Sequence, residues 1–368
     1  MKTHLARRIS LLQNEMHQAG LDLVVFTDRE NLIYYTGALA IECMGIVIPA
    51  EGEAVLCCLW LDTAYVREVS GAKQVQPYHY PSSSIGQAIV KAMKSFSLPA
   101  PAVGFHKYFV EFGTFDMIRK AFPDMTWHPA MGLTYKIRAV KDDEELAHMR
   151  HACAFLEVGM AAAIEHVRPG VTELDVLAEA DYAMRKAGSD GATFRQQVTN
   201  WSKQLLAHPY AMNEIIENNQ PVVVHLGASC QGYTAKMCRT VFLGNIPDET
   251  LRIYKLLVKA QAVTVKACKP GAVVSDVYEE VFALIKREGY GNYFQDNLGY
   301  GIGIRQTEFY PIVGKGVSHK LEKNMLINVL SPTIYKSGVG GPRVKDIVLV
   351  GCDGGELLTH FSREIIRK

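Results

Sequence analysis

A helix–turn–helix pattern occurs twice in the second half of the chain, and this repeat constrains the fold more than any other feature. The segment 168–176, Arg-Pro-Gly-Val-Thr-Glu-Leu-Asp-Val, recurs at 269–277 as Lys-Pro-Gly-Ala-Val-Val-Ser-Asp-Val, an offset of 101 residues (270 − 169). Gly188 and Gly289 end the two copies at the same offset. Each copy predicts a helix, a Pro-Gly turn and a second helix, capped by Thr172 or by Ser275. Duplicated α/β halves pack around a pseudo-twofold axis, so we expect the functional site in a pocket where the halves meet.

Helical and strand patterns alternate through the first part of the chain. Apolar periodicity predicts helices at residues 5–19, 84–96 and 114–122, and strands at 21–26, 45–49 and 54–60. This alternation predicts a compact α/β domain over residues 1–132, followed by a second domain over 133–368. The acidic run 142–145 favours the start of a long helix, because negative side chains suit a helix N-terminus.

Composition excludes several classes of function. Of the 368 residues, 48% are hydrophobic and 21% are charged, which is typical of a globular protein, and the formal net charge is only +1. This near balance predicts neither a nucleic acid nor a membrane as partner. The first residues lack the apolar stretch of a signal peptide, and the 8 cysteines form no Cys-x-x-Cys pair, so we expect a cytoplasmic protein with reduced thiols.

Motifs spread over nearly the whole chain resemble those of one known superfamily. They are Asn31–Gly37, Val224–Gly227 with Gly232-Tyr233-x-x-Lys236-x-x-Arg239-Thr240, Gly299–Gly303, Thr307-Glu308-x-x-Pro311 and Arg343–Asp346. These segments resemble the creatinase/prolidase/aminopeptidase P superfamily, whose members share the pita-bread fold. The resemblance implies an α+β protein in which a smaller α/β creatinase-type N-terminal domain precedes a pseudo-twofold duplicated pita-bread C-terminal domain.

The resemblance also implies where metal ions would bind and shows that the residues there differ. Metallopeptidases of this superfamily hold two divalent metals with two Asp, one His and two Glu. The matching positions in this chain are His225, Lys236, Tyr300, Leu330 or the adjacent Ser331, and Lys345. A charged ammonium group cannot ligate a cation, and hard divalent metals need carboxylates or neutral imidazoles. We therefore expect no metal and no other cofactor.

Creatinase, a member of the same superfamily, works without a metal, and its catalytic histidine precedes the first metal-site strand. His208 lies 17 residues before His225 (225 − 208) and resembles that histidine. An imidazole near its normal pKa moves protons at neutral pH, so we predict that His208 carries protons. Of the other predicted catalytic residues, Glu308 would carry protons with His208 or accept a substrate ammonium, and Tyr300 would orient the substrate as a hydrogen-bond donor. The alternative is a histidine that only caps a loop or binds a backbone carbonyl. Since Cys238 and Leu330 replace the glutamates of creatinase, creatinase activity itself is not expected.

The altered positions suggest a binding site for an anion. Lys236, Lys345, His225 and Arg343 are predicted to converge on one cleft, which would suit a small-molecule substrate with a carboxylate or phosphate group. The alternative is internal pairing, in which Glu308 and Asp346 neutralise the two lysines.

The resemblance further implies a homodimer in which the N-terminal domain of the partner lies near the site. In that arrangement Glu42 would face the cationic cleft, and the alternative is a solvent-exposed loop acid.

The sequence thus predicts a metal-independent hydrolase or lyase that acts on a carbon–nitrogen bond of a small, polar, anionic substrate. A non-catalytic protein that binds a peptide or small anion is the main alternative, and a metallopeptidase with fewer metals is a third.

Overall fold

The chain divides into two compact units, residues 1–138 and 139–368, in a computed structural model. The structure describes residues 1–106, 110–192, 194–206, 209–329 and 334–368. The boundary predicted from the sequence, 132/133, lies six residues earlier. The difference arises because helix α6 (Met131–Ala139) runs through the expected junction without a break.

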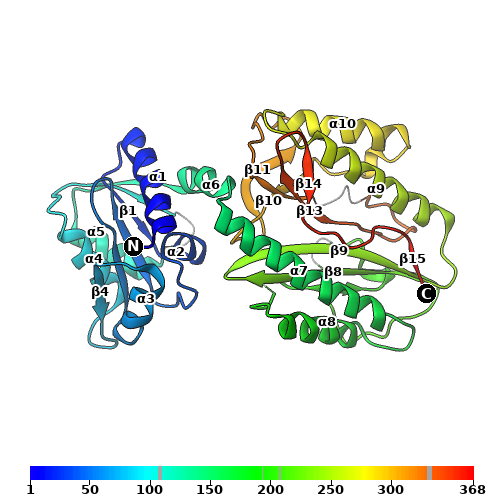
Figure 1. Ribbon diagram of the computed structural model, residues 1–368, viewed down its shortest axis with the longest axis horizontal. Coiled ribbons are helices and arrows are strands. Elements are labelled where there is room, and N and C mark those ends of the chain that lie inside the picture. Colours follow the sequence, from blue (N-terminus) through cyan, green and yellow to red (C-terminus); the bar gives the residue numbers. More distant parts are fainter. Residues whose placement is uncertain (107–109, 193, 207–208, 330–333) are drawn as a thin grey trace. The chain divides into compact units, whose positions relative to one another are not determined.

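Unit 1 is built on one mixed sheet with the strand order β4-β3-β2-β1-β5-β6 (Figure 1). Its strands are β1 (Leu23–Phe26), β2 (Gly45–Pro49), β3 (Val55–Leu59), β4 (Val75–Tyr78), β5 (Ala102–Phe105) and β6 (Thr126–Pro129). Besides α6, its helices are α1 (Thr3–Ala19), α2 (Arg29–Thr36), α3 (Thr63–Ser70), α4 (Ile85–Lys94) and α5 (Phe112–Ala121).

The predicted elements of unit 1 form because their apolar residues face its core. In α1, Leu5, Leu12 and Met16 recur at helical spacing and are fully buried. Gly20 ends this helix in the left-handed conformation, with φ of 66°. Strands β1 and β2 are buried along their whole length, which explains their nearly continuous apolar sequences.

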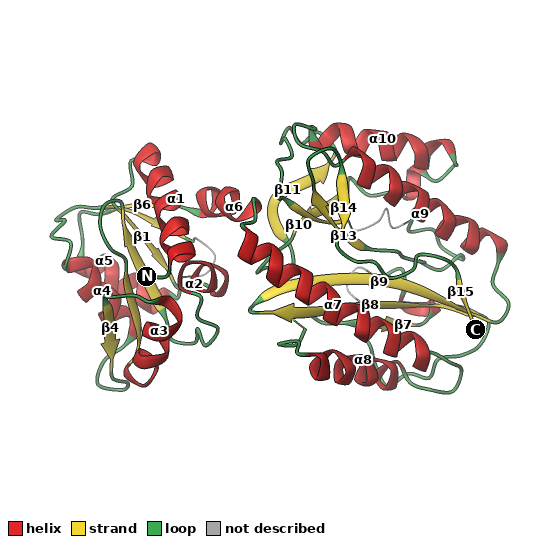
Figure 2. Ribbon diagram, in the orientation of Figure 1, coloured by secondary structure: helices red, strands yellow, loops and turns green. Residues whose placement is uncertain are grey.

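Unit 2 contains two sheets, with strand orders β15-β9-β8-β7 and β11-β10-β12-β13-β14 (Figure 2). The first comprises β7 (Gln197–Thr199), β8 (Gln220–Cys230), β9 (Tyr233–Leu243) and β15 (Ile366–Arg367). The second comprises β10 (Asn297–Gly301), β11 (Glu308–Gly314), β12 (Leu326–Val329), β13 (Asp346–Val350) and β14 (Gly355–Leu357). Helices α7 (Asp143–His166) and α8 (Glu173–Ala187) lie on the first sheet's side, and α9 (Asp248–Ala267) and α10 (Val274–Arg287) on the second's.

The repeat seen in the sequence is present in the structure as two helix pairs. Helices α8 and α10 begin 101 residues apart (274 − 173), as the repeat requires. Thr172 caps α8 as predicted, because its hydroxyl accepts a hydrogen bond from the backbone N–H of Asp175 at 3.1 Å. The predicted cap at Ser275 is wrong. Helix α10 begins one residue before Ser275, and its N-cap is Val273, which has no side-chain acceptor.

The long helix predicted from the acidic run is α7, and the run supplies its cap. The backbone N–H of Glu145 donates to the Asp142 carboxylate at 2.9 Å, while the N–H of Asp142 donates to the Glu145 carboxylate at 3.0 Å. This reciprocal arrangement pairs N–H groups that a helix start leaves free. The helix then lies along β8 and β9 and covers one face of their sheet.

The two sheets of unit 2 are joined at one edge by backbone hydrogen bonds. Cys238 of β9 and Lys345 exchange two N–H···O bonds, each of 3.1 Å. Two residues further along, the Thr240 hydroxyl accepts from the Arg343 N–H at 2.8 Å and donates to the Arg343 carbonyl at 2.9 Å. These bonds fix the residues before β13 against β9, and so position one sheet relative to the other.

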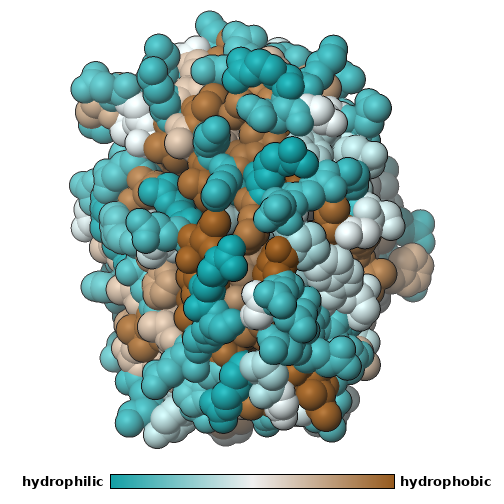
Figure 3. Space-filling view, turned by 90° about the vertical axis from the view of Figure 1, so that its right-hand side faces the viewer, coloured by the Kyte–Doolittle hydropathy of each residue, from teal (hydrophilic) through white to brown (hydrophobic). Residues whose placement is uncertain are grey.

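The side of the molecule that Figure 3 shows has no broad apolar face. Figure 3 shows mostly hydrophilic residues on one side of the molecule, with apolar residues confined to narrow bands between them. Among the residues that the structure describes, no helix combines the length and the apolar character needed to cross a membrane.

Candidate functional site

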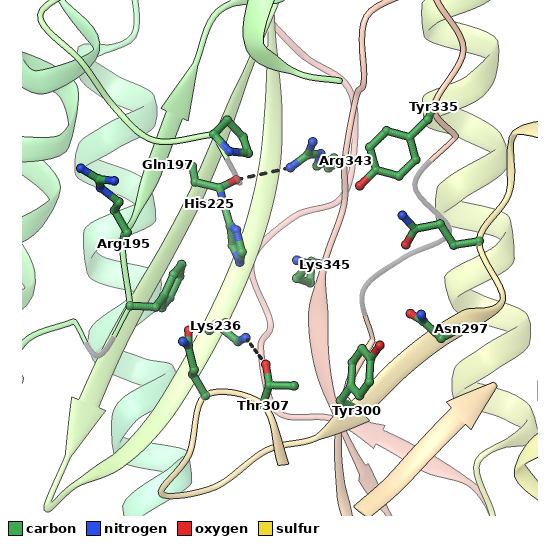
Figure 4. Close-up of a pocket in the computed structure, with 14 residues that line it drawn as sticks. Arg195, Gln197, His225, Lys236, Asn297, Tyr300, Thr307, Tyr335, Arg343 and Lys345 are labelled. Atoms are coloured by element: carbon green, nitrogen blue, oxygen red, sulfur yellow. Dashed lines mark hydrogen bonds between the residues drawn. The ribbon is translucent and has the colours of Figure 1, made fainter. Parts of the chain in front are cut away.

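A cavity of about 520 Å³ lies between the two sheets of unit 2 (Figure 4). This volume falls within the range of small-molecule sites, and the location between the halves is the one expected from the repeat. The cavity is lined by Phe194, Arg195, Gln197, Pro209, His225, Lys236, Gln295, Asn297, Tyr300, Gln306, Thr307, Tyr335, Arg343 and Lys345. The lining residues include basic, amide and aromatic side chains, and no carboxylate is among these described residues.

The pairing of β8 with β9 brings His225 and Lys236 to one face of their sheet. His225 lies opposite Cys238, and Gly227 lies opposite Lys236. Side chains two residues apart on a strand point the same way, so all of these positions face the cavity side. The interval of 11 residues between His225 and Lys236 therefore places both in the cavity, as the sequence predicted.

Gly227 makes room for an aromatic ring in the cavity wall. A Cβ atom at this position would lie 2.3 Å from Cε1 of Phe194. The centroids of the Phe194 and His225 rings lie 4.9 Å apart. The Lys236 ammonium lies 5.4 Å from the centroid of the Phe194 ring. Phe194 can occupy this place beneath the cation only because residue 227 has no side chain.

We expect Gly227→Ala to displace the Phe194 ring and to cost about 1–3 kcal/mol of stability through overpacking. Urea denaturation measures this cost. The double variant Gly227→Ala/Phe194→Leu should recover most of it, because the smaller side chain removes the clash. Equal losses in the single and double variants would contradict this account.

Burial shapes the charges in the cavity. Burial, and secondarily the nearby Lys345, lowers the pKa of Lys236 from 10.5 to about 7. Burial likewise lowers the pKa of Lys345 to about 8, with Arg343 contributing in the same direction. Burial and the three neighbouring cations hold the pKa of His225 well below its ordinary value, so its imidazole is neutral near pH 7. Neither ring nitrogen of His225 has a hydrogen-bond partner among the described residues.

Arg343 is held in the cavity by neutral acceptors. Its Nη2 donates to the backbone carbonyl of Gln204 at 2.5 Å, and its Nη1 donates to the Gln197 side chain at 3.3 Å (Figure 4). The Gln204 side chain in turn accepts from the Gly341 N–H at 3.0 Å. This network links the segment after β7 to the segment before β13, which carries Arg343 and Lys345.

The segment after β7 is anchored at both ends by one buried carboxylate. Glu173 is fully buried and accepts hydrogen bonds from the backbone N–H groups of Asn200 and Met212, each at 2.9 Å. The Lys203 ammonium also donates to Glu173. Residues 200 and 212 are therefore held close together, and Pro209 from this segment lines the cavity.

The structure does not support the internal pairing of Lys345 with Asp346. Asp346 instead accepts from Nη2 of Arg239 at 2.8 Å and from the Thr359 hydroxyl at 2.6 Å. Lys236 donates to the Thr307 hydroxyl at 3.3 Å, so its contact is a neutral one. No ion pair involving Lys236 or Lys345 occurs among the described residues.

Glu308 lies outside the cavity lining, although Tyr300 is part of it. The Glu308 side chain is buried, and its Oε1 accepts from the Arg305 N–H at 3.3 Å. Lys141 and Glu308 both lie next to Gly303, where a Cβ would be 3.3 Å from the ammonium nitrogen and 3.6 Å from the carboxylate oxygen. Glu308 is therefore buried beside Gly303, next to the cavity-lining Thr307, and the catalytic role predicted for it stays a prediction.

Some predicted site residues are not placed by the structure. His208, Leu330 and Ser331 lie outside the described residues. Glu42 is exposed in unit 1, in the segment after α2. The roles given to His208 and Glu42 stay predictions.

Several lining residues were missed by the sequence analysis, chiefly the amides Gln197, Gln295, Asn297 and Gln306. They lie in loops or at strand ends, where no periodic pattern indicates which way a side chain points. Arg195 and Tyr335 were missed for the same reason. Asn297 lies three residues before Tyr300, within the strand whose glycine-rich motif was recognised, and that proximity is the one signal that could have identified it.

Comparisons with known proteins agree with this architecture. The model of metallopeptidase family M24 matches residues 147–351, and that of the creatinase/prolidase N-terminal domain matches residues 8–140. An uncharacterized peptidase of Bacillus subtilis, YqhT, is 26% identical over 359 residues, covering 98% of this chain and 99% of the relative. A Xaa-Pro dipeptidase of Pyrococcus horikoshii is 26% identical over 356 residues, covering 95% of this chain and 96% of the relative.

A solved structure also shows the same fold. The Xaa-Pro dipeptidase from Bacillus anthracis superposes with a TM-score of 0.91 at 24% identity and covers 99% of this chain and 100% of that chain. The expected α+β fold, a creatinase-type domain followed by a duplicated pita-bread domain, is thereby confirmed. Since the first family model spans more than half of the sequence, the chain belongs to metallopeptidase family M24 and carries a creatinase/prolidase N-terminal domain.

Proposed function

We propose that this chain is a metal-independent hydrolase or lyase that acts on a carbon–nitrogen bond of a small, polar, anionic substrate. The peptidases and dipeptidases among its full-length relatives support hydrolysis. One observation carries the rest of the proposal: Lys236 and Lys345 both line the cavity, and neither has a carboxylate partner among the described residues. Unpaired buried cations are costly, and an anionic ligand relieves that cost.

The residues that line the cavity do not suit the metal ions that the family name implies. Divalent metals are bound by carboxylate oxygens and neutral imidazoles. His225 supplies one imidazole, but Lys236, Tyr300 and Lys345 occupy other positions of the family's ligand set. A lysine ammonium has no lone pair for a metal while it is protonated, and its charge repels a cation. We therefore propose that the protein's own side chains carry the reaction.

The proposed roles divide between proton transfer and binding. His208 is the proposed proton carrier, supported by its resemblance to the creatinase histidine and by Pro209, the next residue, which lines the cavity. Arg343, Lys345 and Lys236 bind the anionic part of the substrate, and Tyr300 donates a hydrogen bond from its phenol. Glu308, which is buried next to the lining residue Thr307, is the proposed partner of His208 in proton transfer. The homodimer with Glu42 near the site remains part of this proposal.

His208→Ala should lower turnover about 100-fold or more, because a positioned acid–base group contributes that much. Turnover is measured as amine or ammonia release from a panel of creatine, other guanidino acids, cyclic amidines and proline dipeptides. The control is His360→Ala, at an exposed histidine outside the cavity. Unchanged turnover in His208→Ala would contradict the assigned role.

The metal-independent part of the proposal has its own test. Purified protein is analysed for bound metals, and turnover is measured with and without a chelator. We expect no effect of the chelator. Stoichiometric zinc, manganese, cobalt or iron whose removal abolishes turnover would overturn this part.

A further inference from the structure

The cations of the cavity follow a regular spacing along two paired chain segments. Arg343 lies beside Thr240, and Lys345 lies beside Cys238, as their hydrogen bonds show. Lys236 is two residues beyond Cys238 on the same strand and faces the same side. A strand rises about 3.3 Å per residue, so the Cα atoms that carry the three cations follow one another roughly every 7 Å over about 13 Å. Figure 4 shows Arg343, Lys345 and Lys236 following one another in this order along the cavity.

This row of cations, Arg343, Lys345 and Lys236, has only neutral partners among the described residues. Arg343 donates to the carbonyl of Gln204 and to the side-chain oxygen of Gln197. Lys236 donates to the Thr307 hydroxyl. The exposed fractions of the three residues are 5%, 7% and 5% in the order of the row, so water reaches them poorly. A single negative charge at one end would leave the far end of such a row unbalanced.

The opposite wall has a different chemistry. Asn297 and Tyr300 of β10, with Tyr335, face the row and carry neutral hydrogen-bonding groups (Figure 4). The side-chain oxygen of Asn297 is buried and has no hydrogen-bond partner among the described residues. A buried acceptor without a partner is costly unless a ligand donor, such as an amide N–H, reaches it.

We propose that the cavity binds an elongated ligand with two separate carboxylates and an uncharged amide, the class of N-acylated acidic amino acids. This inference deepens the proposed function and rests on it. The two carboxylates lie along the row of cations, and the amide N–H faces Asn297. Hydrolysis breaks the amide C–N bond; water supplies a hydroxyl to the acyl carbon and a proton to the amine. Phosphate is too compact to reach the whole row.

Calorimetric titration of the full-length protein near pH 7 tests the charge requirement. The probes are N-acetylaspartate, N-acetylasparagine, which has nearly the same shape but one carboxylate fewer, and inorganic phosphate. We expect N-acetylaspartate to bind at least about tenfold more tightly than N-acetylasparagine, since one buried charged hydrogen bond contributes that much. Lys236→Met should remove most of this preference, whereas Lys255→Met, at an exposed lysine of α9, should leave it intact.

Three outcomes would overturn the inference: equal affinity for the two amides, tighter binding of phosphate than of either, or no binding of N-acetylaspartate at millimolar concentration. The proposed function is tested separately by amine release from N-acetylaspartate in the wild type and in His208→Ala. Selective binding of the dicarboxylate without amine release would support the inference on charge and count against the hydrolase.

Discussion

Replacing Lys236 and Lys345 together with methionine should make the protein more stable near pH 7, by roughly 3 kcal/mol for each replacement. Methionine keeps much of the length of lysine and removes the charge. The gain is expected because the pKa of Lys236 falls from 10.5 to about 7 on folding and that of Lys345 to about 8. Each lowered pKa means that the folded state disfavours a proton that the unfolded chain binds readily. Urea denaturation of the wild type and the variants measures the difference.

The same reasoning predicts how the gain depends on pH. Above pH 10.5 both lysines are neutral in the folded and unfolded states, so the replacements raise the free energy of unfolding only slightly. As the pH falls from 10.5 to about 8 for Lys345 and to about 7 for Lys236, the unfolded state binds protons that the folded state does not. The wild type therefore loses stability relative to the variant over this window, and the difference levels off below it. The variant should meanwhile lose affinity for anionic ligands.

Lys203 provides a matched control, because its replacement by methionine should lower stability where replacement of the cavity lysines raises it. Its ammonium is also buried, but it pairs with Glu173 and, at 3.2 Å, with Glu214. Lys203→Met leaves a buried carboxylate without its counter-ion and should cost about 3 kcal/mol or more. If Lys236→Met and Lys345→Met destabilised the protein as Lys203→Met does, the two cavity lysines would have to be paired, and the anion-binding account would fail.

Arg239→Met should lower the free energy of unfolding by about 3–5 kcal/mol, the cost of breaking a buried ion pair from one side. Arg239 is fully buried and its guanidinium donates to the Asp346 carboxylate at 2.8 Å. It also donates to backbone carbonyls of Cys238, Lys345, Phe361 and Ser362, at 2.7–3.1 Å. Removing the guanidinium leaves these buried acceptors without their donor, which adds to the cost.

The double variant Arg239→Met/Asp346→Leu distinguishes the ion pair from general damage to the fold. Removing both charges should restore part of the loss, because no buried carboxylate is then left unpaired. Arg363→Met is the control at a half-buried arginine: its hydrogen bond to Gln261 is 3.5 Å long, so its loss should cost far less stability than the loss of Arg239. A loss below about 1 kcal/mol in Arg239→Met would contradict the structural role given to this residue.

The fold could be predicted largely because its signals are local and periodic. The repeated Pro-Gly turn marks where two helices meet, and the acidic residues at 142–145 mark the start of α7. The convergence of His225 with Lys236 also followed from the sequence, because a hairpin of known register decides which residues share a face. The predicted helix cap at Ser275 failed because it depends on an exact position: α10 starts one residue before Ser275.

The site was less predictable because several of its side chains are positioned by contacts between segments that are distant in the sequence. Arg343 is held by Gln204, 139 residues away, and nothing in either local sequence indicates that contact. Asp346 follows Lys345 directly, yet it pairs with Arg239, because neighbouring residues on a strand point to opposite faces. Glu308 adjoins Thr307, which lines the cavity, but its own side chain is buried and is not among the lining residues, and no local sequence signal separates the two.

The division of the cavity walls between the two repeats has a consequence for how the domain comes apart. His225 and Lys236 belong to the sheet of the first repeat, whereas Asn297 and Tyr300 belong to the sheet of the second. A molecule that touches both walls is a cross-link between them, and its binding free energy is lost as soon as they separate. An occupied cavity thus favours a single cooperative unfolding step over the piecemeal opening of either half.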